Sequence, residues 1–449
     1  MSRFALVLPC VILARMAGNS CDVAIIGGGP AGATTAIYLR LHGYKIVVLE
    51  KVRFPRFHIG ESLLPENLAL FDELGIQDRI RQRGYTKKFG AEFVSQCGKH
   101  VRKFYFRNRL LPGATMAYQV LRSDFDLLLL DRAREVGADV REQSAVTDVV
   151  PTDDAYELEV TPDQGEPYKI RAGVLVDASG QDTFLSSRWH LKKLDRRHRR
   201  FAVFSHFRHV DRDTGDDAGN IRIIPFGEGH WFWVIPLSDD LTSIGAVVTK
   251  EIVREHRDDL ERYLLSAVKQ TPALEQRMSR AEQVEPVRVI ADYSYESSRY
   301  GGTRFLIVGD AAAFLDPVFS SGVLMAMSSA REAAKAIHSA FQKKDFNWKA
   351  LRAYEREHRR KVRTFFRLIR AYYRPAFLEM FMNPTDFLGL KAAIATRLAG
   401  NAEHRFRLWW RVELFYFIGW LRGFMRPKRS RSTGVTECSH GCSVHSGGA

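Results

Sequence analysis

Small residues at a fixed spacing stand near the start of the chain, between an apolar run and a helix-like pattern. These small residues are Gly27, Gly29, Ala31 and Gly32. The three glycines have the GxGxxG spacing, in which the first glycine makes a turn and the second lets the backbone approach a pyrophosphate. The third glycine lets the following helix pack closely on the strand. Glu50 ends the next predicted strand, where a carboxylate can accept a hydrogen bond from a ribose hydroxyl. These residues predict that the chain binds a dinucleotide.

Two further signals of this kind lie far along the chain. Asp310 follows Gly309 at the end of the apolar run 305–308, and three alanines come next, so a bulky ligand could approach the backbone. Arg122 precedes an apolar helical pattern. An enzyme that binds only NAD needs the first motif alone. An acidic residue such as Asp310, which follows an inserted segment in the chain, can hold the far half of a longer cofactor. Together these signals indicate FAD.

Ser321 and Gly322 stand at the start of a long helical pattern just beyond Asp310. The first turn of a helix has N–H groups without partners and a partial positive charge, so it binds anions well. We therefore expect a small anion to bind at these two residues, beside the cofactor.

These residues need a scaffold that brings them together. Strand and helix patterns alternate from residue 22 to 50, strand-like segments with turns between them fill 201–249, and the chain beyond Ser320 is helical to about Met425. We predict an α/β fold, with a Rossmann-like FAD-binding domain, an inserted antiparallel β-sheet substrate region and a helical C-terminal region. The predicted boundaries are 1–20 for an N-terminal extension, 21–345 for the FAD-binding domain with its insertion at about 85–120 and 195–290, 346–426 for the helical region and 427–449 for a disordered tail.

Several short motifs occur together in the order typical of one enzyme family. They are WFWVIP at 231–236, which matches a WxWxIP signature, IGESLLP at 59–65, YTKKFGA at 85–91, ADYSY at 291–295 and the segment 309–322. Through them the chain resembles the flavin-dependent halogenases, and among these the branch that halogenates pyrroles and phenols. The resemblance covers about residues 22–345. It implies that Asp310 lies near the ribityl and pyrophosphate part of FAD, and Arg122 near the pyrophosphate.

The resemblance also implies a reaction. Reduced FAD, O2 and a chloride or bromide ion would yield hypohalous acid, with the halide held by backbone N–H groups around Ser321 and Gly322. A lysine would then present the halogen to an aromatic ring. Lys88 is the expected catalytic residue because it directly precedes the Phe-Gly-Ala of the family motif, whereas the adjacent Lys87 is expected to be solvated. An ammonium could hydrogen-bond the hypohalous oxygen, and a neutral amine could carry the halogen covalently.

Aromatic residues are expected to form the wall of the substrate site. Trp231 and Trp233 should point to one face of a strand. Such pairs are mostly core, but the resemblance implies that they also separate flavin from substrate. Phe319 stands two positions before Ser321, where tryptophan halogenases carry a glutamate that helps to remove the ring proton. We therefore expect an already activated ring as substrate, a phenol or a pyrrole, either free or tethered to an acyl carrier protein.

Charge and cysteine usage bear on partners and location. The net charge of +15 slightly favours an acidic carrier protein, although a solvated basic face explains it too, and nucleic acid is not an expected partner. No second nucleotide motif is evident for NADPH, so a separate flavin reductase should supply FADH2. The five cysteines form no disulfide framework and no apolar run is long enough to span a bilayer, so the cytoplasm is the expected location. Cys438 and Cys442, near two histidines in the polar tail, are not expected to form a metal site.

Two other functions stay open from the sequence. The first is an FAD-dependent aromatic monooxygenase or reductase that shares these motifs. The second is a non-catalytic flavoprotein that docks on a membrane through the segments 363–374 and 404–424, which mix aromatic and basic residues. Helices that pack one face on the core and expose Arg and Lys on the other would explain the same pattern.

Overall fold

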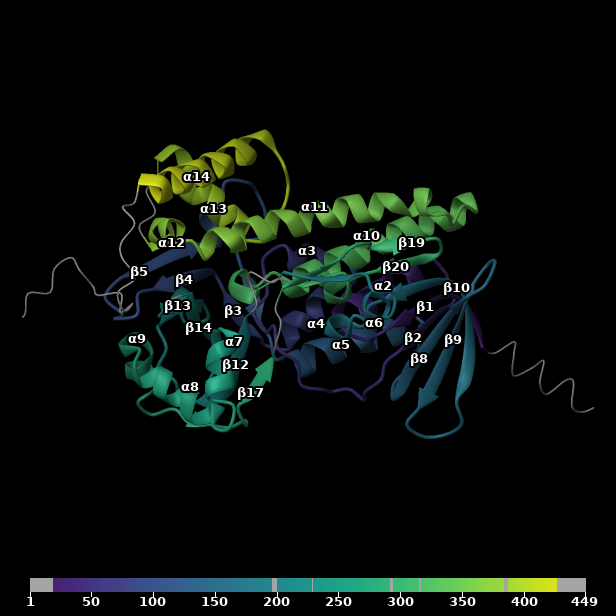
Figure 1. Ribbon diagram of the computed structural model, residues 1–449, viewed down its shortest axis with the longest axis horizontal. Coiled ribbons are helices and arrows are strands. Elements are labelled where there is room, and N and C mark those ends of the chain that lie inside the picture. Colours follow the sequence, from purple (N-terminus) through teal and green to yellow (C-terminus); the bar gives the residue numbers. More distant parts are fainter. Residues whose placement is uncertain are drawn as a thin grey trace, which may run out of the picture.

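The computed structural model describes residues 19–195, 200–227, 229–290, 294–314, 316–382 and 387–425. Most of the predicted N-terminal extension and the whole predicted tail, including Cys438 and Cys442, lie outside the described residues. The predicted fold class is confirmed: two large sheets lie side by side, and a group of helices from the C-terminal part of the chain covers them (Figure 1).

The main sheet has a parallel core. In spatial order its strands are β19 (Gly301–Gly302), β20 (Phe305–Ile307), β10 (Tyr168–Asp177), β1 (Ser20–Ile26), β2 (Ile46–Leu49) and β7 (Asp139–Arg141). All neighbouring pairs from β20 to β7 are parallel, and β2 and the carboxyl ends of β1 and β10 are buried because helices cover the sheet. The strands β8 (Ser144–Pro151) and β9 (Tyr156–Pro162) extend β10 as an antiparallel meander. Helix α10 (Gly322–Lys343) packs along α2 (Pro30–Leu41), and α2 packs along α5 (Arg122–Glu135).

This topology explains why the predicted cofactor residues meet. The carboxyl ends of parallel strands lie at one edge of a sheet, and ligands bind in the crevice outside that edge. Gly27 follows β1, Glu50 follows β2 and Gly309 closely follows β20. The rest of this region consists of α3 (Asn67–Glu73), α4 (Gln77–Gln82), α6 (Phe184–Arg188) and the small sheet of β11 (Lys192–Leu194), β18 (Tyr295–Ser297) and β21 (Ala313–Phe314).

The second sheet contains most of the predicted insertion. In spatial order its strands are β16 (Glu282–Gln283), β12 (Phe201–Arg208), β15 (Thr242–Val248), β14 (His230–Pro236), β13 (Ile221–Phe226), β4 (Gly90–Val94) and β5 (Val101–Tyr105), with β17 (Arg288–Ile290) also paired to β12. The sheet is antiparallel except for the pair β13–β4, which is parallel. This pair joins two segments far apart in the chain, so no hairpin dictates its direction. The helices α7 (Lys250–Glu255), α8 (Leu260–Lys269) and α9 (Pro272–Glu275) lie on one side of the sheet (Figure 1).

Strand β14 separates two apolar cores, as the alternation in its sequence predicts. Trp231, Trp233 and Ile235 belong to the core shared with the main sheet. Phe232 and Val234 face the smaller core formed with α8.

Gly245 makes room for Trp233 on the neighbouring strand, where the two residues are directly paired. A Cβ atom at position 245 would lie 2.3 Å from Cζ2 of Trp233 and 2.5 Å from Cβ of Phe204. We expect Gly245→Ala to lower the free energy of unfolding by about 1–3 kcal/mol because Trp233 cannot keep its position. Denaturant unfolding followed by tryptophan fluorescence measures this. Gly423→Ala is the matched control, since its new methyl group would meet only Ala376 at 3.8 Å, and equal stabilities of the two variants would contradict the prediction.

Helices from the C-terminal part of the chain cover one end of the second sheet (Figure 1). They are α11 (Trp348–Tyr372), α12 (Pro375–Met382), α13 (Leu390–Leu398) and α14 (Phe406–Met425). The long α11 packs on α10, and α12 packs on β4 and β5. Helix α13 packs on β5 and on the short 3-10 helix η1 (Phe106–Asn108). Within the described ranges, no helix is long and apolar enough to cross a membrane.

Candidate functional site

A deep cleft of about 480 Å³ opens at the carboxyl edge of the main sheet and reaches the second sheet. This volume lies within the range of roughly 300–1,000 Å³ that is common for small-molecule sites. Many of the residues predicted from the sequence line it: Gly27, Gly29, Ala31, Glu50, Arg122, Trp231, Trp233, Asp310 and Gly322. The cleft therefore brings the predicted cofactor, anion and wall residues into one site.

The glycine turn fits a ligand that approaches the backbone closely. Gly27 has a φ of +100°, and a Cβ atom there would lie 2.4 Å from the carbonyl oxygen of Ala178. A Cβ at Gly32 would lie 1.9 Å from the carbonyl oxygen of Gly27, so this glycine lets α2 begin against the strand end. The Glu50 carboxylate accepts hydrogen bonds from the backbone N–H groups of Gly28 at 2.7 Å and Val52 at 3.0 Å. These bonds hold the carboxylate at the cleft, where it can bind a ribose.

Two arginines meet beside this turn, and sequence reasoning identified only one of them. Arg122 is buried, donates to both carboxylate oxygens of Asp126 at 2.7 and 2.9 Å, and donates to the carbonyl of Ile59 at 2.6 Å. Arg56 also faces the cleft, with Nη1 3.3 Å from Asp126. That Nη1 is buried and has no hydrogen-bond partner among the described residues, and Nη2 lies 3.3 Å from the Cβ position of Gly29. Arg56 thus forms an ion pair with Asp126 through Nη1 and reaches the glycine turn with Nη2, where a pyrophosphate would lie, which fits FAD.

Replacement of Arg56 by methionine tests this donor. We expect Arg56→Met to weaken FAD binding by about 10- to 100-fold, because one hydrogen bond to a charged group contributes about 1.5–3 kcal/mol. Isothermal titration of the apoprotein with FAD measures the dissociation constant. Arg53→Met is the control because this neighbouring arginine is exposed. Equal FAD affinities of the two variants would show that Arg56 does not contribute to FAD binding.

Asp310 lies at the floor of the cleft, in the turn that follows β20. Burial raises the pKa of its carboxyl to about 7, and the nearby Arg122 acts in the opposite direction. Gly309 has a φ of +59°, donates its N–H to Oγ of Ser329 at 2.9 Å, and would bring a Cβ within 2.9 Å of the methyl group of Ala31. The missing side chain of Gly309 therefore lets the Asp310 turn lie close to α2 at Ala31, so both halves of an extended cofactor can bind in one cleft.

The residues of the predicted anion site lie at the start of α10. Ser320 adopts a left-handed conformation with a φ of +55°, the buried Ser321 is the N-cap residue, and α10 begins at Gly322. Gly322 is exposed to the cleft, and no described atom beyond its chain neighbours and the nearby backbone of α10 lies within 4 Å of the position that its Cβ would take. Asp316 fixes the preceding turn because its carboxylate accepts a hydrogen bond from the N–H of Val318 at 3.1 Å. The start of a long helix thus faces a small open space.

The tryptophan wall is connected to this turn by a residue that sequence reasoning missed. Nε1 of Trp231 donates to the hydroxyl of Tyr373 at 2.9 Å, and that hydroxyl donates to the Asp316 carboxylate at 2.6 Å. Burial raises the pKa of Asp316 to about 6. Trp233 is held separately, by a hydrogen bond from its Nε1 to Oγ of Ser243 at 3.1 Å. Tyr373 is 57 residues from Asp316, so only the tertiary structure reveals this link.

Lys88 and Lys87 differ sharply in their exposure to solvent. They lie on the short strand β3 (Thr86–Lys88), which pairs with β6 (Ala117–Gln119). Lys87 is exposed, whereas Lys88 is 1% exposed and donates from Nζ to Oγ of Ser62 at 2.8 Å and to the carbonyl of Leu63 at 3.0 Å. Burial lowers the pKa of Lys88 to about 7. Ser62 lines the cleft, so the Lys88 amine lies directly behind the cleft wall.

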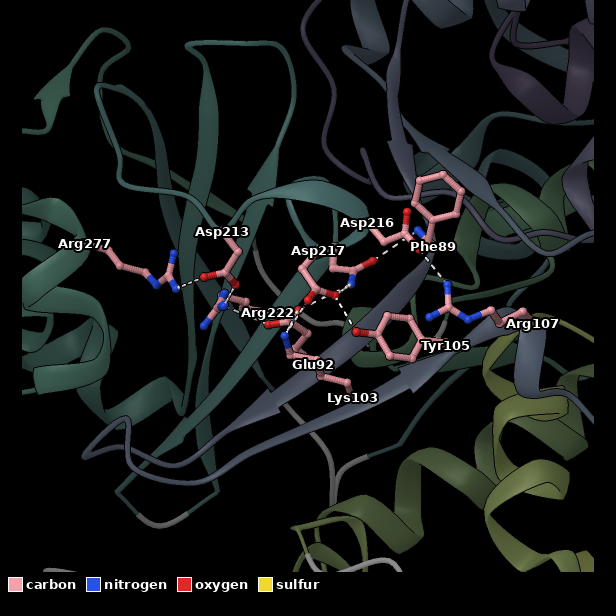
Figure 2. A network of polar contacts seen from close by, with 11 residues as sticks. Phe89, Glu92, Lys103, Tyr105, Arg107, Asp213, Asp216, Asp217, Arg222 and Arg277 are labelled. Carbon is pink, nitrogen blue, oxygen red and sulfur yellow. Dashed lines mark hydrogen bonds and ion pairs between the residues drawn. The ribbon is translucent and has the colours of Figure 1, made fainter.

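A network of charged residues fixes the chain next to Lys88 (Figure 2). The backbone N–H of Phe89 donates to the side chain of Asn220 at 3.1 Å, and Asn220 donates to Asp217 at 3.0 Å. Lys103 and Tyr105 donate to the same Asp217 carboxylate at 2.5 and 2.8 Å. Further ion pairs continue the network through Glu92, Arg222, Asp213 and Arg277. The strand that carries Lys88 is therefore anchored to the second sheet.

Phe319 lies in an aromatic cluster behind the cleft. It is 3% exposed, and its ring centroid is 5.8 Å from that of Tyr372 and 5.9 Å from that of Phe381. It is not among the residues that line the cleft, so Phe319 separates the anion turn from the C-terminal helices. Within the part of the chain that the structure describes, no group of three or more His, Cys, Asp or Glu side chains is arranged to hold a metal ion.

Comparison with known proteins agrees with this geometry. Residues 20–367 match the family model described as FAD binding domain. Over 381 residues, covering 80% of this chain and 85% of the relative, the chain is 33% identical to the 1H-pyrrole-2-carbonyl-[peptidyl-carrier protein] chlorinase of Pseudomonas fluorescens. It is 34% identical to the corresponding brominase of Pseudoalteromonas luteoviolacea, with 74% of this chain and 80% of the relative covered. The solved structure of the flavin-dependent brominase Bmp2 superposes with a TM-score of 0.78 at 29% identity, over 89% of this chain and 99% of that one.

Proposed function

This chain belongs to the flavin-dependent halogenases, and from that premise we propose that it halogenates an electron-rich aromatic ring, a pyrrole or a phenol. The observation that carries this proposal is the Lys88 amine, which is buried behind the wall of an FAD cleft and has a lowered pKa. A lysine that only stabilised the fold would gain nothing from such burial, because removing an ammonium from water is costly.

Each part of the cleft has a separate task in the proposed reaction. Reduced FAD, when bound, supplies the electrons with which O2 and a halide ion become hypohalous acid. Gly29, Arg56 and Arg122 would hold the pyrophosphate, Glu50 a ribose, and Asp310 the ribityl part. The first N–H groups of α10, at Gly322, would hold the chloride or bromide ion.

Lys88 receives the hypohalous acid in this proposal and orients the halogen towards the ring. The oxygen–halogen bond breaks, a carbon–halogen bond forms, and the ring loses a proton, so that the oxygen leaves as water. Trp231 and Trp233 line the cleft and keep the aromatic substrate away from the cofactor. Phe319 offers no carboxylate to accept the ring proton, so the substrate must be activated already.

The similar proteins support a tethered substrate. The relatives from Pseudomonas fluorescens and Pseudoalteromonas luteoviolacea are named for a pyrrole-2-carbonyl group on a peptidyl carrier protein. We therefore propose a pyrrole on a carrier protein as the substrate, with a free phenol as the second candidate. A separate flavin reductase would supply FADH2, and the reaction would take place in the cytoplasm.

A substrate panel tests the proposal. The purified protein is incubated with a flavin reductase, FAD, O2 and either chloride or bromide, and with a pyrrolyl carrier protein, free pyrrole-2-carboxylate or a phenol. Mass spectrometry should detect replacement of ring hydrogen by halogen, strictly dependent on halide. Oxygenated product that forms without halide would instead assign an aromatic monooxygenase. Efficient reduction of FAD by NAD(P)H with the purified protein alone would contradict the separate reductase.

A further inference from the structure

A groove lined by basic residues runs along α11, between this helix and the helices α13 and α14. Four of its cations follow one another on a single face of α11: Lys349, Arg352, Arg356 and Arg363. Their spacing of three, four and seven residues places them in one row on a helix. At a rise of 1.5 Å per residue, the row is about 21 Å long.

The side chains of these cations are unpaired within the described part of the chain. No side chain of the four forms a hydrogen bond or an ion pair with another described residue, and the same holds for the guanidinium group of Arg299 at the end of the groove. Other arginines of α11 are neutralised, because Arg359 pairs with Glu355 at 2.6 Å and Arg367 with Glu413 at 2.5 Å. The unpaired row therefore adds repulsion to the free molecule and is available for an acidic partner.

The groove lies close to the Lys88 site, with α13 between them. On one side of this helix, Arg397 lines the groove, and its Nε is buried without a hydrogen-bond partner among the described residues. On the other side, Ala399, directly after the helix, packs on Phe106. The Phe106 ring in turn lies 5.5 Å from Nζ of Lys88. The basic groove and the Lys88 amine therefore lie on opposite sides of α13, with the Phe106 ring between this helix and the amine.

We infer that this groove is the docking site for the acidic helical face of a carrier protein, which brings its tethered ring to Lys88. The inference rests on the carrier-tethered substrate of the proposed function and identifies the surface that binds the carrier. A row of cations on one helix face complements acidic residues along one face of another helix. Its position would place a docked carrier on the far side of α13 from the Lys88 amine, away from the cofactor cleft.

Charge reversal tests the groove. The variant Arg352→Glu/Arg356→Glu/Arg363→Glu is compared with the control Lys250→Glu/Arg254→Glu/Lys269→Glu, which makes the same charge change on exposed positions of α7 and α8. Each variant is assayed with two substrates: pyrrole-2-carbonyl attached to a peptidyl carrier protein, and the same group attached to pantetheine alone. We expect the groove variant to raise the KM for the carrier-bound ring by about 10-fold or more and to leave pantetheine turnover unchanged. The control should match the wild type, and the wild-type KM for the carrier should rise with salt.

The other outcomes overturn the inference in distinguishable ways. If the wild type halogenates the carrier-bound ring and the groove variant has the same KM, the docking site lies elsewhere while the proposed function stands. If the wild type halogenates only free rings, the carrier-tethered substrate and the docking site both fail. If the groove variant loses only co-sedimentation with vesicles of phosphatidylserine and phosphatidylcholine, and carrier kinetics do not change, the groove binds membrane instead. An equal loss on both pyrrole substrates would show that these arginines act on turnover of the ring and not on the carrier, and would also overturn the inference.

Discussion

Replacement of Lys88 by methionine is expected to abolish halogenation while the oxidation of reduced flavin continues. Methionine fills the same space, so the packing against Phe106 and Ser62 should survive. The amine is lost, and groups that transfer a proton or carry a reacting atom contribute about 100- to 10,000-fold to a rate. Halogenated product, measured by mass spectrometry for each flavin oxidised, should fall by that factor. Hypohalous acid should then appear in solution, where a chromogenic trap can detect it.

The neighbouring lysine is the matched control for this prediction. Lys87→Met changes the same residue type on the same strand, but at an exposed position, so product yield should not change. Lys88→Met should also unfold no more readily than the wild type at or below pH 7. Burial lowers the pKa of Lys88 to about 7, so the folded protein binds fewer protons there than the unfolded chain and loses stability as pH falls from about 10 towards 7. Full halogenation by Lys88→Met would move the catalytic role to another residue.

The pH dependence distinguishes the two chemistries that an amine at this position could perform. Nζ of Lys88 has two acceptors, at Ser62 and Leu63, and no acidic side chain among the described residues forms an ion pair with it. A neutral amine satisfies both acceptors with its two N–H groups and directs its lone pair at the incoming halogen. We therefore expect halogenated product per flavin oxidised to rise as the pH increases through 7. A yield that falls over the same range would show that the ammonium is the active form.

The cofactor site could be predicted from the sequence because its ligand restricts residue types at short range. A pyrophosphate requires Gly27 and Gly32 where a Cβ would collide with backbone, and the strand order then brings Glu50 and Asp310 to the same edge. The alternation along 231–236 likewise predicted that the two tryptophans share one face. The residues of each pattern lie close together in the chain, so a single sequence is enough to recognise the pattern.

The residues that the sequence did not reveal act across long separations. Asn220 binds the N–H of Phe89 from 131 residues away, and Tyr373 reaches Asp316 from 57 residues away. Arg56 carries no periodic or motif signal, and its role depends on the position of Asp126, on another element. The parallel pair β13–β4 joins segments from the two parts of the insertion, so hairpin logic could not predict it. Local sequence patterns predict which groups belong to the candidate site, whereas only the tertiary structure shows how these groups are positioned.

Addition of one methyl group at Gly322 is expected to weaken halide binding without unfolding the protein. No described atom beyond the chain neighbours and the nearby backbone of α10 lies within 4 Å of the new Cβ position, so Gly322→Ala should fold normally. The backbone N–H groups at the start of α10 remain, but the methyl group occupies the space beside them that faces the cleft. We expect the KM for halide to rise by about 10-fold or more, which corresponds to about 1.4 kcal/mol, while the dissociation constant of FAD changes little.

The size of the halide separates this steric effect from a general disturbance of the cleft. Because the added methyl group narrows the anion space, the KM for the larger bromide should rise more than the KM for chloride. Val323→Ala is the control: it removes bulk from the adjacent cleft position and leaves the space beside Gly322 open, so neither halide should be affected. Halide titrations of the product yield, with saturating FADH2, measure both constants. Equal increases for chloride and bromide, or an unchanged KM in Gly322→Ala, would place the halide away from the start of α10.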